Sequence, residues 1–202
     1  MPKYRLGGIM NRKCFLIFKA MIVLLFSVSS CKTIEFGTER IDINGMIYDF
    51  SNRPVPNCEI TLDEKYRSCT DINGRFSLPG IPADAYTITG YKNGYELYLE
   101  EIEIRDRGQI IYIRIPSQGQ LNSLVDEALS ANNLVMAEEL AERAYKIDNR
   151  NIETLFYCAV IKFRRNDIDA AITLLENAKN LGSRDIYIEK FLNMLTEAKN
   201  AE

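Results

Sequence analysis

A turn between two runs of alternating residues is encoded in the stretch Thr70-Asp71-Ile72-Asn73-Gly74-Arg75-Phe76-Ser77-Leu78. An aspartate such as Asp71 caps a tight turn by accepting hydrogen bonds from nearby backbone amides, and Gly74 tolerates a positive φ. The turn is therefore expected to bring residues 66–70 back against residues 75–78. Asp71 and Asn73 also resemble the opening of a calcium loop, but the acidic ligands that should follow are missing at the required spacing. We expect a bare turn and no metal.

The sequence on both sides of this turn alternates between apolar and polar residues, from residue 41 to residue 116. Near its end, Ile111 and Ile113 fall on one face of a strand while Tyr112 and Arg114 fall on the other. Gly, Pro and Asn separate the runs, which is typical of a β-sandwich. Seven short strands are expected: Ile41–Asp49, Cys58–Leu62, Tyr66–Thr70, Arg75–Leu78, Tyr86–Lys92, Tyr95–Ile104 and Gln109–Pro116.

The order of several segments in this region matches a known family. Gly45-Met46-Ile47-Tyr48-Asp49 and Pro54-Val55-Pro56-Asn57-Cys58-Glu59-Ile60 precede the turn, and Pro79-Gly80-Ile81-Pro82 follows it. Together with residues 70–78 they resemble the carboxypeptidase regulatory-like domain. The resemblance implies a seven-stranded antiparallel, transthyretin-like β-sandwich, although Ala85 stands where the family has Gly. It implies no chemistry, because such modules serve as spacers, adhesion pieces and accessory domains.

Two cysteines, Cys58 and Cys69, flank the dipeptide Asp63-Glu64. If this dipeptide is a two-residue hairpin loop, the cysteines face each other on neighbouring strands, and a disulfide is geometrically compatible in an oxidising compartment. The same register would place two basic side chains on the apolar face, and a shift of one residue would remove the pairing. Two small buried thiols are the alternative.

After Pro116 the periodicity becomes helical, and an internal repeat of 34 residues appears. This spacing is that of the tetratricopeptide repeat, a helix–turn–helix unit whose helix crossings need small residues. Two units are expected at residues 118–151 and 152–185, within a helical domain of residues 117–202. The aligned pairs are Leu121 with Leu155, Val125 with Ala159, Asn132-Asn133 with Asn166-Asp167, Ala137 with Ala171, and Ala144 with Ala178.

This pattern resembles the tetratricopeptide repeat family, although Asn149 and Ser183 replace its usual Pro. A third amphipathic stretch, with Ile188 and Leu192 on its apolar side, is expected to be a capping helix. Stability normally takes about three repeats. We therefore expect the array to lean on this cap, on the β-domain or on a second copy in a homo-oligomer.

In the tetratricopeptide family the first helix of each unit lines the concave, ligand-facing side. By this resemblance the inward positions are Asn122, Asp126 and Leu129 in the first unit. In the second unit they are Phe156, Val160 and Phe163, flanked by Arg164, and the three apolar residues form a one-sided helical stripe. The stripe either accepts an apolar segment of a partner, with Arg164 and Arg165 taking a carboxylate, or is buried as core.

The first 30 residues have the pattern of a secretory signal peptide. They carry five basic residues and no acid, and an apolar run from Cys14 to Val28 is too short for a comfortable membrane span. Ser27-Val28-Ser29-Ser30 before Cys31 resembles a bacterial lipobox. The resemblance implies that Cys31 is acylated as the first mature residue and that residues 31–40 are a tether. An ordinary signal peptide or an uncleaved anchor is the alternative, and either Met1 or Met10 is the start.

Composition narrows the function to binding or scaffolding. The chain of 202 residues has no His, which removes the commonest general base, and a formal net charge of −3 argues against a nucleic-acid partner. We expect a non-catalytic, lipid-anchored adaptor of the cell envelope, with no cofactor and an unidentified protein partner. Because Lys32 follows Cys31, we expect the anchor in the outer membrane. The alternative is a structural or adhesive surface lipoprotein whose sandwich contacts envelope material or glycan, for example through Tyr86, Tyr91, Tyr95 and Tyr98.

Overall fold

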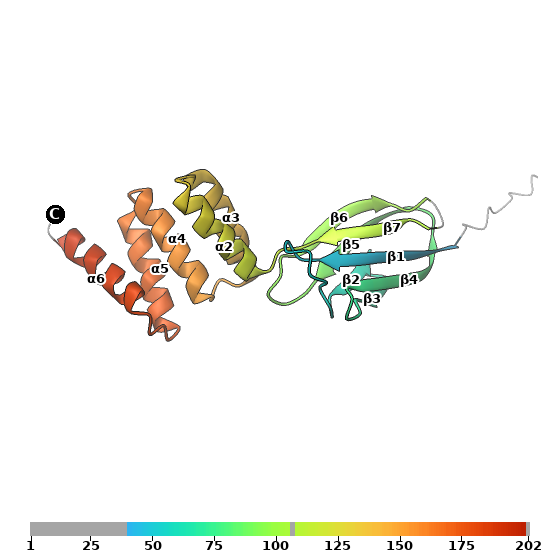
Figure 1. Ribbon diagram of the computed structural model, residues 1–202, viewed down its shortest axis with the longest axis horizontal. Helices are drawn as coiled ribbons and strands as arrows, with labels where there is room; N and C mark the ends of the chain where they lie inside the picture. Colours follow the sequence, from blue (N-terminus) through green and yellow to red (C-terminus); the bar gives the residue numbers. More distant parts are fainter. Residues whose placement is uncertain (1–39, 106–107, 201–202) are drawn as a thin grey trace, which may run out of the picture. The chain divides into compact units, whose positions relative to one another are not determined.

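The computed structural model describes residues 40–105 and 108–200, and within them seven strands precede five helices (Figure 1). The expected signal peptide, the acylated Cys31 and the tether up to residue 39 lie outside the described residues. The strands span residues 40 to 114 and the helices begin at Gln118, so the order β then α is as expected.

Two sheets enclose one core. The first has the strand order β4-β1-β7, and the second has the order β3-β2-β5-β6. Their bounds are β1 Arg40–Tyr48, β2 Glu59–Leu62, β3 Tyr66–Cys69, β4 Arg75–Pro82, β5 Ala85–Tyr91, β6 Tyr98–Glu103 and β7 Ile110–Arg114. The predicted β-sandwich is confirmed.

The strand pair β1/β7 departs from the expected antiparallel arrangement, because β7 runs parallel to β1 with Ile47 beside Ile113. β6 is an edge strand of the second sheet, and β7 belongs to the first. If a hairpin joined β6 to β7, the two strands would be antiparallel neighbours in one sheet. The chain instead crosses to the other sheet after β6, so β7 can run parallel to β1.

The predicted turn at Asp71–Gly74 is confirmed, but it connects the two sheets and does not form a hairpin within one. Asp71 Oδ1 accepts hydrogen bonds of 2.8 Å from the amides of Asn73 and Arg75, and Gly74 has φ +74°. β3 before the turn pairs with β2, while β4 after it pairs with β1. Residues 66–69 and 75–82 therefore lie in different layers.

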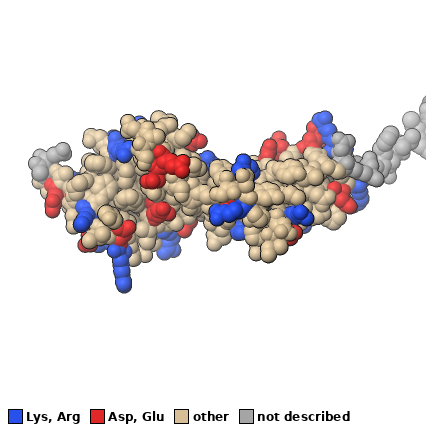
Figure 2. All heavy atoms as spheres, viewed as in Figure 1, with Lys and Arg blue, Asp and Glu red and all other residues tan. Residues whose placement is uncertain are grey.

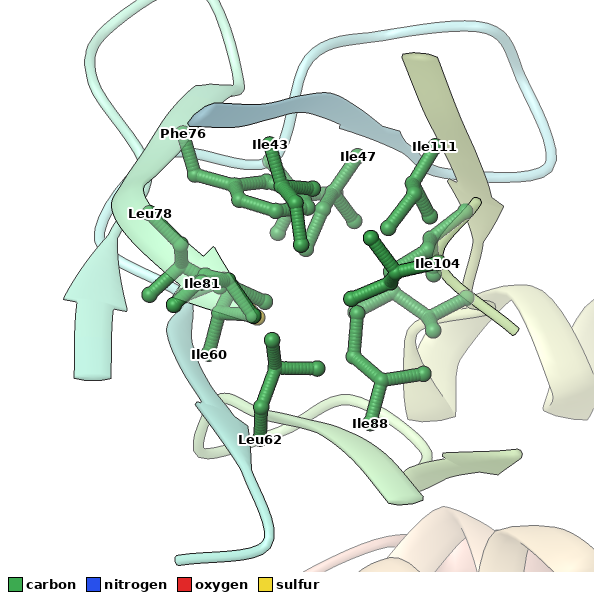
Figure 3. Packing of buried hydrophobic residues seen from close by; sticks show 14 of the residues in the cluster. Ile43, Ile47, Ile60, Leu62, Phe76, Leu78, Ile81, Ile88, Ile104 and Ile111 are labelled. Atoms are coloured by element: carbon green, nitrogen blue, oxygen red, sulfur yellow. The ribbon is translucent and has the colours of Figure 1, made fainter. Parts of the chain in front are cut away.

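The core of the sandwich is aliphatic and comes from both layers (Figure 3). Ile43 and Ile47 of β1 point toward Ile60 and Leu62 of β2, and all four are at most 1% exposed. Alternation along β1 explains this, since successive side chains point to opposite faces of a sheet. Ile88 of β5 completes the contact between the layers.

The helices pair into two helix–turn–helix units followed by a fifth helix. Each of the first four begins with an oxygen-bearing cap residue (Ser117, Asn133, Asn151 and Asp167) whose side chain accepts a backbone amide hydrogen bond. The turns inside the units contain Asn132 and Asn166 at φ 56° and 63°, a conformation that asparagine tolerates well. The helices are α2 Gln118–Ser130, α3 Leu134–Ile147, α4 Ile152–Arg164, α5 Ile168–Asn180 and α6 Ile186–Asn200.

The residues aligned by the 34-residue repeat are the ones that pack between helices. Leu121 and Val125 of α2 are buried against Ala137 and Ala144 of α3 in one cluster. The residues 34 positions later, from Leu155 to Ala178, are buried in a second cluster that also includes α6. The small side chains let the paired helices approach closely, as the sequence pattern predicts.

Candidate protein-binding surface

An aromatic group joins α4 to α6. The ring of Phe191 on α6 lies 6.3 Å from that of Phe156 and 5.4 Å from that of Phe163, centroid to centroid, and both contacts are edge-to-face. Edge-to-face packing is a favourable geometry for aromatic pairs. The i, i+7 spacing on α4 therefore builds one continuous apolar surface across two helices.

The predicted stripe is partly buried and partly open. Phe156 and Val160 are half-buried, whereas Phe163 is 39% exposed at the end of α4. The stripe thus combines the two interpretations that the sequence left open: its first turn packs against neighbouring helices, and its last turn faces solvent. We call Phe156, Val160, Phe163 and the α6 residue Phe191, with the exposed α6 residues Tyr187 and Met194, the aromatic surface.

The sequence alone did not identify the contribution of α6 to this surface. Tyr187 is 71% exposed and Met194 is 48% exposed. The signal was present, because Tyr187 and Met194 lie 34 residues after Glu153 and Val160. The helix α6 is therefore a cap that also continues the 34-residue spacing of the exposed positions on α4.

Arg164 has a different role from the predicted one. Its Nη1 donates a hydrogen bond of 3.0 Å to the carbonyl oxygen of Leu129 near the C-terminus of α2, and Arg165 Nη2 donates one of 2.9 Å to Glu138. A cation near the C-terminal carbonyls of a helix satisfies acceptors that lack a partner within the helix. Both guanidinium groups thus already hold the repeats together, which argues against their serving primarily as a carboxylate clamp.

The expected inward positions of the first unit are mostly internal. Asn122 and Leu129 are buried, and only Asp126 is exposed. Asn122 Oδ1 accepts a hydrogen bond of 3.0 Å from the hydroxyl of Thr154, and its amide nitrogen donates one of 3.0 Å to Glu153. Asn122 therefore fixes α2 against α4 and is not available to a ligand.

The outer side of α6 confirms the capping role. In α2 and α4, Leu121 and Leu155 pack on the second helix of their own units. The residue 34 positions after Leu155 is Glu189, and the residue 34 positions after Ala159 is Asn193; both are exposed. A polar outer side closes a repeat array without an aggregation-prone end.

Cys58 and Cys69 do not form the disulfide that the sequence left open, and both are free thiols. Asp63 and Glu64 do make the turn, at φ 46° and 57°, but Lys65 is an extra residue after it, so Leu62 pairs with Tyr66. Cys69 then lies beside Glu59 and faces solvent, while Cys58 faces the core. Burial raises the pKa of the Cys58 thiol to about 11, which makes it inert.

The half-buried thiol of Cys158 is also unreactive. Burial raises its pKa to about 11, and it packs among the residues of the first helical cluster. It is therefore a small core residue, as the sequence indicated.

Within residues 40–105 and 108–200 there is no group of three or more His, Cys, Asp or Glu side chains that could hold a metal ion.

The four tyrosines considered for glycan contact do not form one platform. Tyr86, Tyr95 and Tyr98 pack against the core cluster, and only Tyr91 is mainly exposed. Burial and the carboxylate of Glu100 raise the pKa of Tyr98 to about 12. These rings therefore contribute mainly to the packing of the sandwich.

Among the described helices none is long and apolar enough to cross a bilayer.

Residues 42–111, which form nearly all of this sandwich, match the family model of the carboxypeptidase regulatory-like domain. The sandwich is therefore similar to the domains of that family. The match covers the sheets described above and leaves the helical part of the chain outside it. It agrees with the resemblance seen in the sequence.

Other similarities reach the rest of the chain. The mitochondrial import receptor subunit TOM70 of Saccharomyces cerevisiae, in strains YJM789 and S288c, is 27% identical over 150 residues. The match covers 72% of this chain and 23% of each relative, so the chain spans about a quarter of their length.

Among solved structures, a type II cohesin–X-dockerin complex from Acetivibrio cellulolyticus is 16% identical, covering 39% of this chain and 58% of that chain with a TM-score of 0.33. The major pilin subunit of Bacillus cereus is 14% identical, covering 39% of this chain and 29% of that chain, also with a TM-score of 0.33.

Proposed function

We propose that the protein is a lipid-anchored adaptor of the cell envelope that binds a partner protein through its helical repeats. The anchor is the acylated Cys31, and the outer membrane is the proposed location. The β-sandwich lies between the anchor and the repeats in the sequence and serves as a spacer. The protein catalyses no reaction in this proposal, since the chain contains no His and no recognised catalytic motif.

The observation that carries this proposal is the aromatic surface on α4 and α6. Its rings pack on one another, yet Phe163 and Tyr187 remain open to solvent. Aromatic and Met side chains that are clustered and partly exposed are typical of the centre of protein interfaces. Helix positions at i, i+4 and i+7 fit a partner segment that lies along the helices.

The similarity to an import receptor subunit supports the same role. That relative is named as a receptor, and a receptor function needs a surface that binds other proteins. Arg164 and Arg165 strengthen the surface indirectly, because they bind α2 and α3 and so keep α4 in place. In this proposal the partner contacts are mainly apolar.

Affinity capture from gently solubilised membranes of the native host tests the proposal. The acylated wild-type chain should retain a partner that Phe163→Asp loses, because a carboxylate cannot be buried against an apolar segment without a large desolvation cost. Phe163 is the residue of choice because Phe156 is packed more deeply and its replacement would disturb the fold.

Circular dichroism of each variant provides the control for folding. Tyr145→Asp on α3 is a matched control, since Tyr145 is an aromatic residue with the same exposed fraction, 39%, outside the aromatic surface. Capture of the same proteins by wild type, Phe163→Asp and Tyr145→Asp would contradict the proposal.

A further inference from the structure

The sheet β4-β1-β7 carries apolar residues on its outer face as well as in the core. In β7, Ile111 and Ile113 are buried in the core, yet Ile110 and Tyr112 on the opposite face are 49% and 66% exposed. A strand with one face in water normally alternates apolar and polar residues, whereas a strand covered on both faces is apolar throughout. β7 has the second pattern but is covered on one side only within the described residues.

The neighbouring strand extends this outer apolar area. Met46 of β1 lies beside Tyr112 in the register of the sheet, and Met46 and Tyr48 are both half-buried. The Tyr48 hydroxyl lies 3.4 Å from the sulfur of Met46. Phe50, in the turn after β1, is 40% exposed. We call this area, together with Arg75 and Arg114, the outer sheet face.

Its charges are positive, although the chain is acidic. Arg75 lies beside Met46, and Arg114 lies beside Tyr48. Arg114 donates hydrogen bonds to the carbonyl oxygen of Phe50 and to Asn52, and within the described part of the chain neither arginine forms an ion pair with a carboxylate. In Figure 2 the surface over β1 and β7 is mostly uncharged, with basic side chains among the uncharged ones.

Two acids beside this face, Asp42 and Asp71, are held in place by backbone amides. Asp42, on the same face of β1, accepts a hydrogen bond of 2.8 Å from the amide of Gly80. Asp71 is held by the two amides of its turn. The chain after residue 30, taken as a whole, is acidic: removing the five basic residues of the first 30 from the total of 25 leaves 20 against 28 acids. The outer sheet face is thus a cationic, aromatic area on an anionic protein.

The position of β1 in the chain places this face close to the proposed anchor. Arg40, where β1 begins, is nine positions after Cys31, and nine extended residues span at most about 30 Å. A face tethered so closely meets the membrane surface at a high effective concentration. Arg side chains bind anionic headgroups, and Tyr and Phe favour the interfacial region of a bilayer.

We propose that the outer sheet face, formed by Met46, Tyr48, Ile110 and Tyr112 with Arg75 and Arg114, docks on an anionic lipid surface. This inference rests on the lipid anchor of the proposed function. Docking holds the sandwich against the membrane and covers the apolar outer side of β1 and β7. A second copy of the chain is a poor occupant, because a symmetric contact would bring the arginines of both copies together.

The absence of tryptophan from the sequence allows a direct test. The acylated full-length chain with Tyr112→Trp is reconstituted in phosphatidylcholine vesicles, with and without phosphatidylglycerol, that contain lipids brominated on their acyl chains. Tyr91→Trp is the matched control, since Tyr91 is 55% exposed on β5 of the other sheet. The indole at position 112 should be quenched about twofold more than the indole at position 91, and only in the anionic vesicles.

Charge reversal provides the second comparison. Arg75→Glu should abolish the additional quenching at position 112, whereas Arg67→Glu, which removes an exposed partner of Glu59 on the other sheet, should leave it unchanged. Equal quenching at positions 112 and 91 in vesicles that carry the protein on flotation would overturn the docking and leave the anchor intact.

Two other outcomes would also overturn the docking. If the chain does not float with the vesicles, the anchor is wrong as well, and the proposed function loses its membrane attachment. If a soluble anionic polysaccharide shifts the emission at position 112 to shorter wavelength and anionic vesicles do not, the face binds a polymer and not lipid.

Discussion

The β-sandwich and the helical repeats bury their apolar residues in different ways. In the sandwich, all large buried side chains belong to one cluster that joins strands far apart in the sequence, such as β1 and β7. In the repeats there are two clusters, each made of neighbouring helices, one centred on α2 and α3 and one on α5 and α6. The sandwich is therefore one packing unit, and the helical part is a stack.

This difference predicts different responses to mutation. A domain with a single shared core should unfold cooperatively, because the residues of the core support contacts between both sheets. A stack of repeats depends on nearest neighbours, so damage at one end should remain local. The stacked arrangement also explains why the aromatic surface lies on the repeats. Some positions of α4 and α6 do not contribute to a core, and these positions carry exposed side chains such as Phe163 and Tyr187.

The largest effect is expected from Gly45→Ala at the centre of β1. A methyl group there would lie 2.2 Å from the ring of Phe76 and 2.7 Å from the carbonyl oxygen of Ile111, so the core ring of Phe76 on β4 and the backbone of β7 would both have to shift. We expect a loss of about 3 kcal/mol in the free energy of unfolding, measured by urea denaturation. Gly119→Ala in α2 is the control, because nothing lies within 4 Å of its new methyl group. Similar losses for the two variants would contradict the shared-core description.

An effect of about the same size, but confined to one end of the stack, is expected from Leu192→Ala on α6. Leu192 is buried in the second helical cluster, and the substitution should cost that cluster about 2–4 kcal/mol. Hydrogen exchange followed by mass spectrometry should show faster exchange in α5 and α6, with α2 and the strands unchanged. Asn193→Ala, on the exposed side, should change none of these rates. Faster exchange throughout the strands would show that the two parts unfold together.

Acid should distinguish the two regions through Asp49, which holds the turn after β1. Burial acts to raise the pKa of Asp49, but hydrogen bonds from Arg53 and from the amide of Ser51 lower it more, so the net pKa lies below its ordinary value. The carboxylate therefore contributes stability above its unfolded pKa of about 4, and that stability is lost as the pH falls through the lower folded pKa.

Asp49→Asn tests this contribution. The substitution should cost about 1–3 kcal/mol at neutral pH, and the difference from wild type should disappear as the pH falls below about 4. The measurement is thermal unfolding of the sandwich at several pH values. A difference between the two proteins that does not depend on pH would contradict the assigned role of the carboxylate.

Local signals predicted most of the fold. Alternation located all seven strands to within a few residues, and the 34-residue repeat located the packing positions from Leu121 to Ala178. The pairing of strands far apart in the sequence and the exact register could not be predicted from these local patterns. The crossing from β6 to β7 and the extra residue Lys65 after a correctly predicted turn were both missed. A shift of one residue moves every side chain to the other face, so this small error separated Cys58 from Cys69.

In the candidate site, too, the sequence predicted local features but not the contacts between residues far apart in the chain. The sequence indicated Phe156, Val160 and Phe163 correctly as one stripe, since helical spacing is a local property. It could not show that Phe191 packs against that stripe or that Arg164 binds the carbonyl oxygen of Leu129, because those partners are 28 and 35 residues away from Phe163 and Arg164. Only the packing of the repeats decides such contacts.

The measurement that tests the central claim most directly is the affinity of the captured partner for three purified proteins: wild type, Phe163→Asp and Tyr145→Asp. Phe163 and Tyr145 have equal exposure, but only Phe163 belongs to the aromatic surface. We predict that Phe163→Asp binds at least about tenfold more weakly, a loss of about 1.4 kcal/mol, while Tyr145→Asp binds as the wild type does. Equal affinity of Phe163→Asp and wild type, with the fold intact, would contradict the assignment of partner binding to this surface.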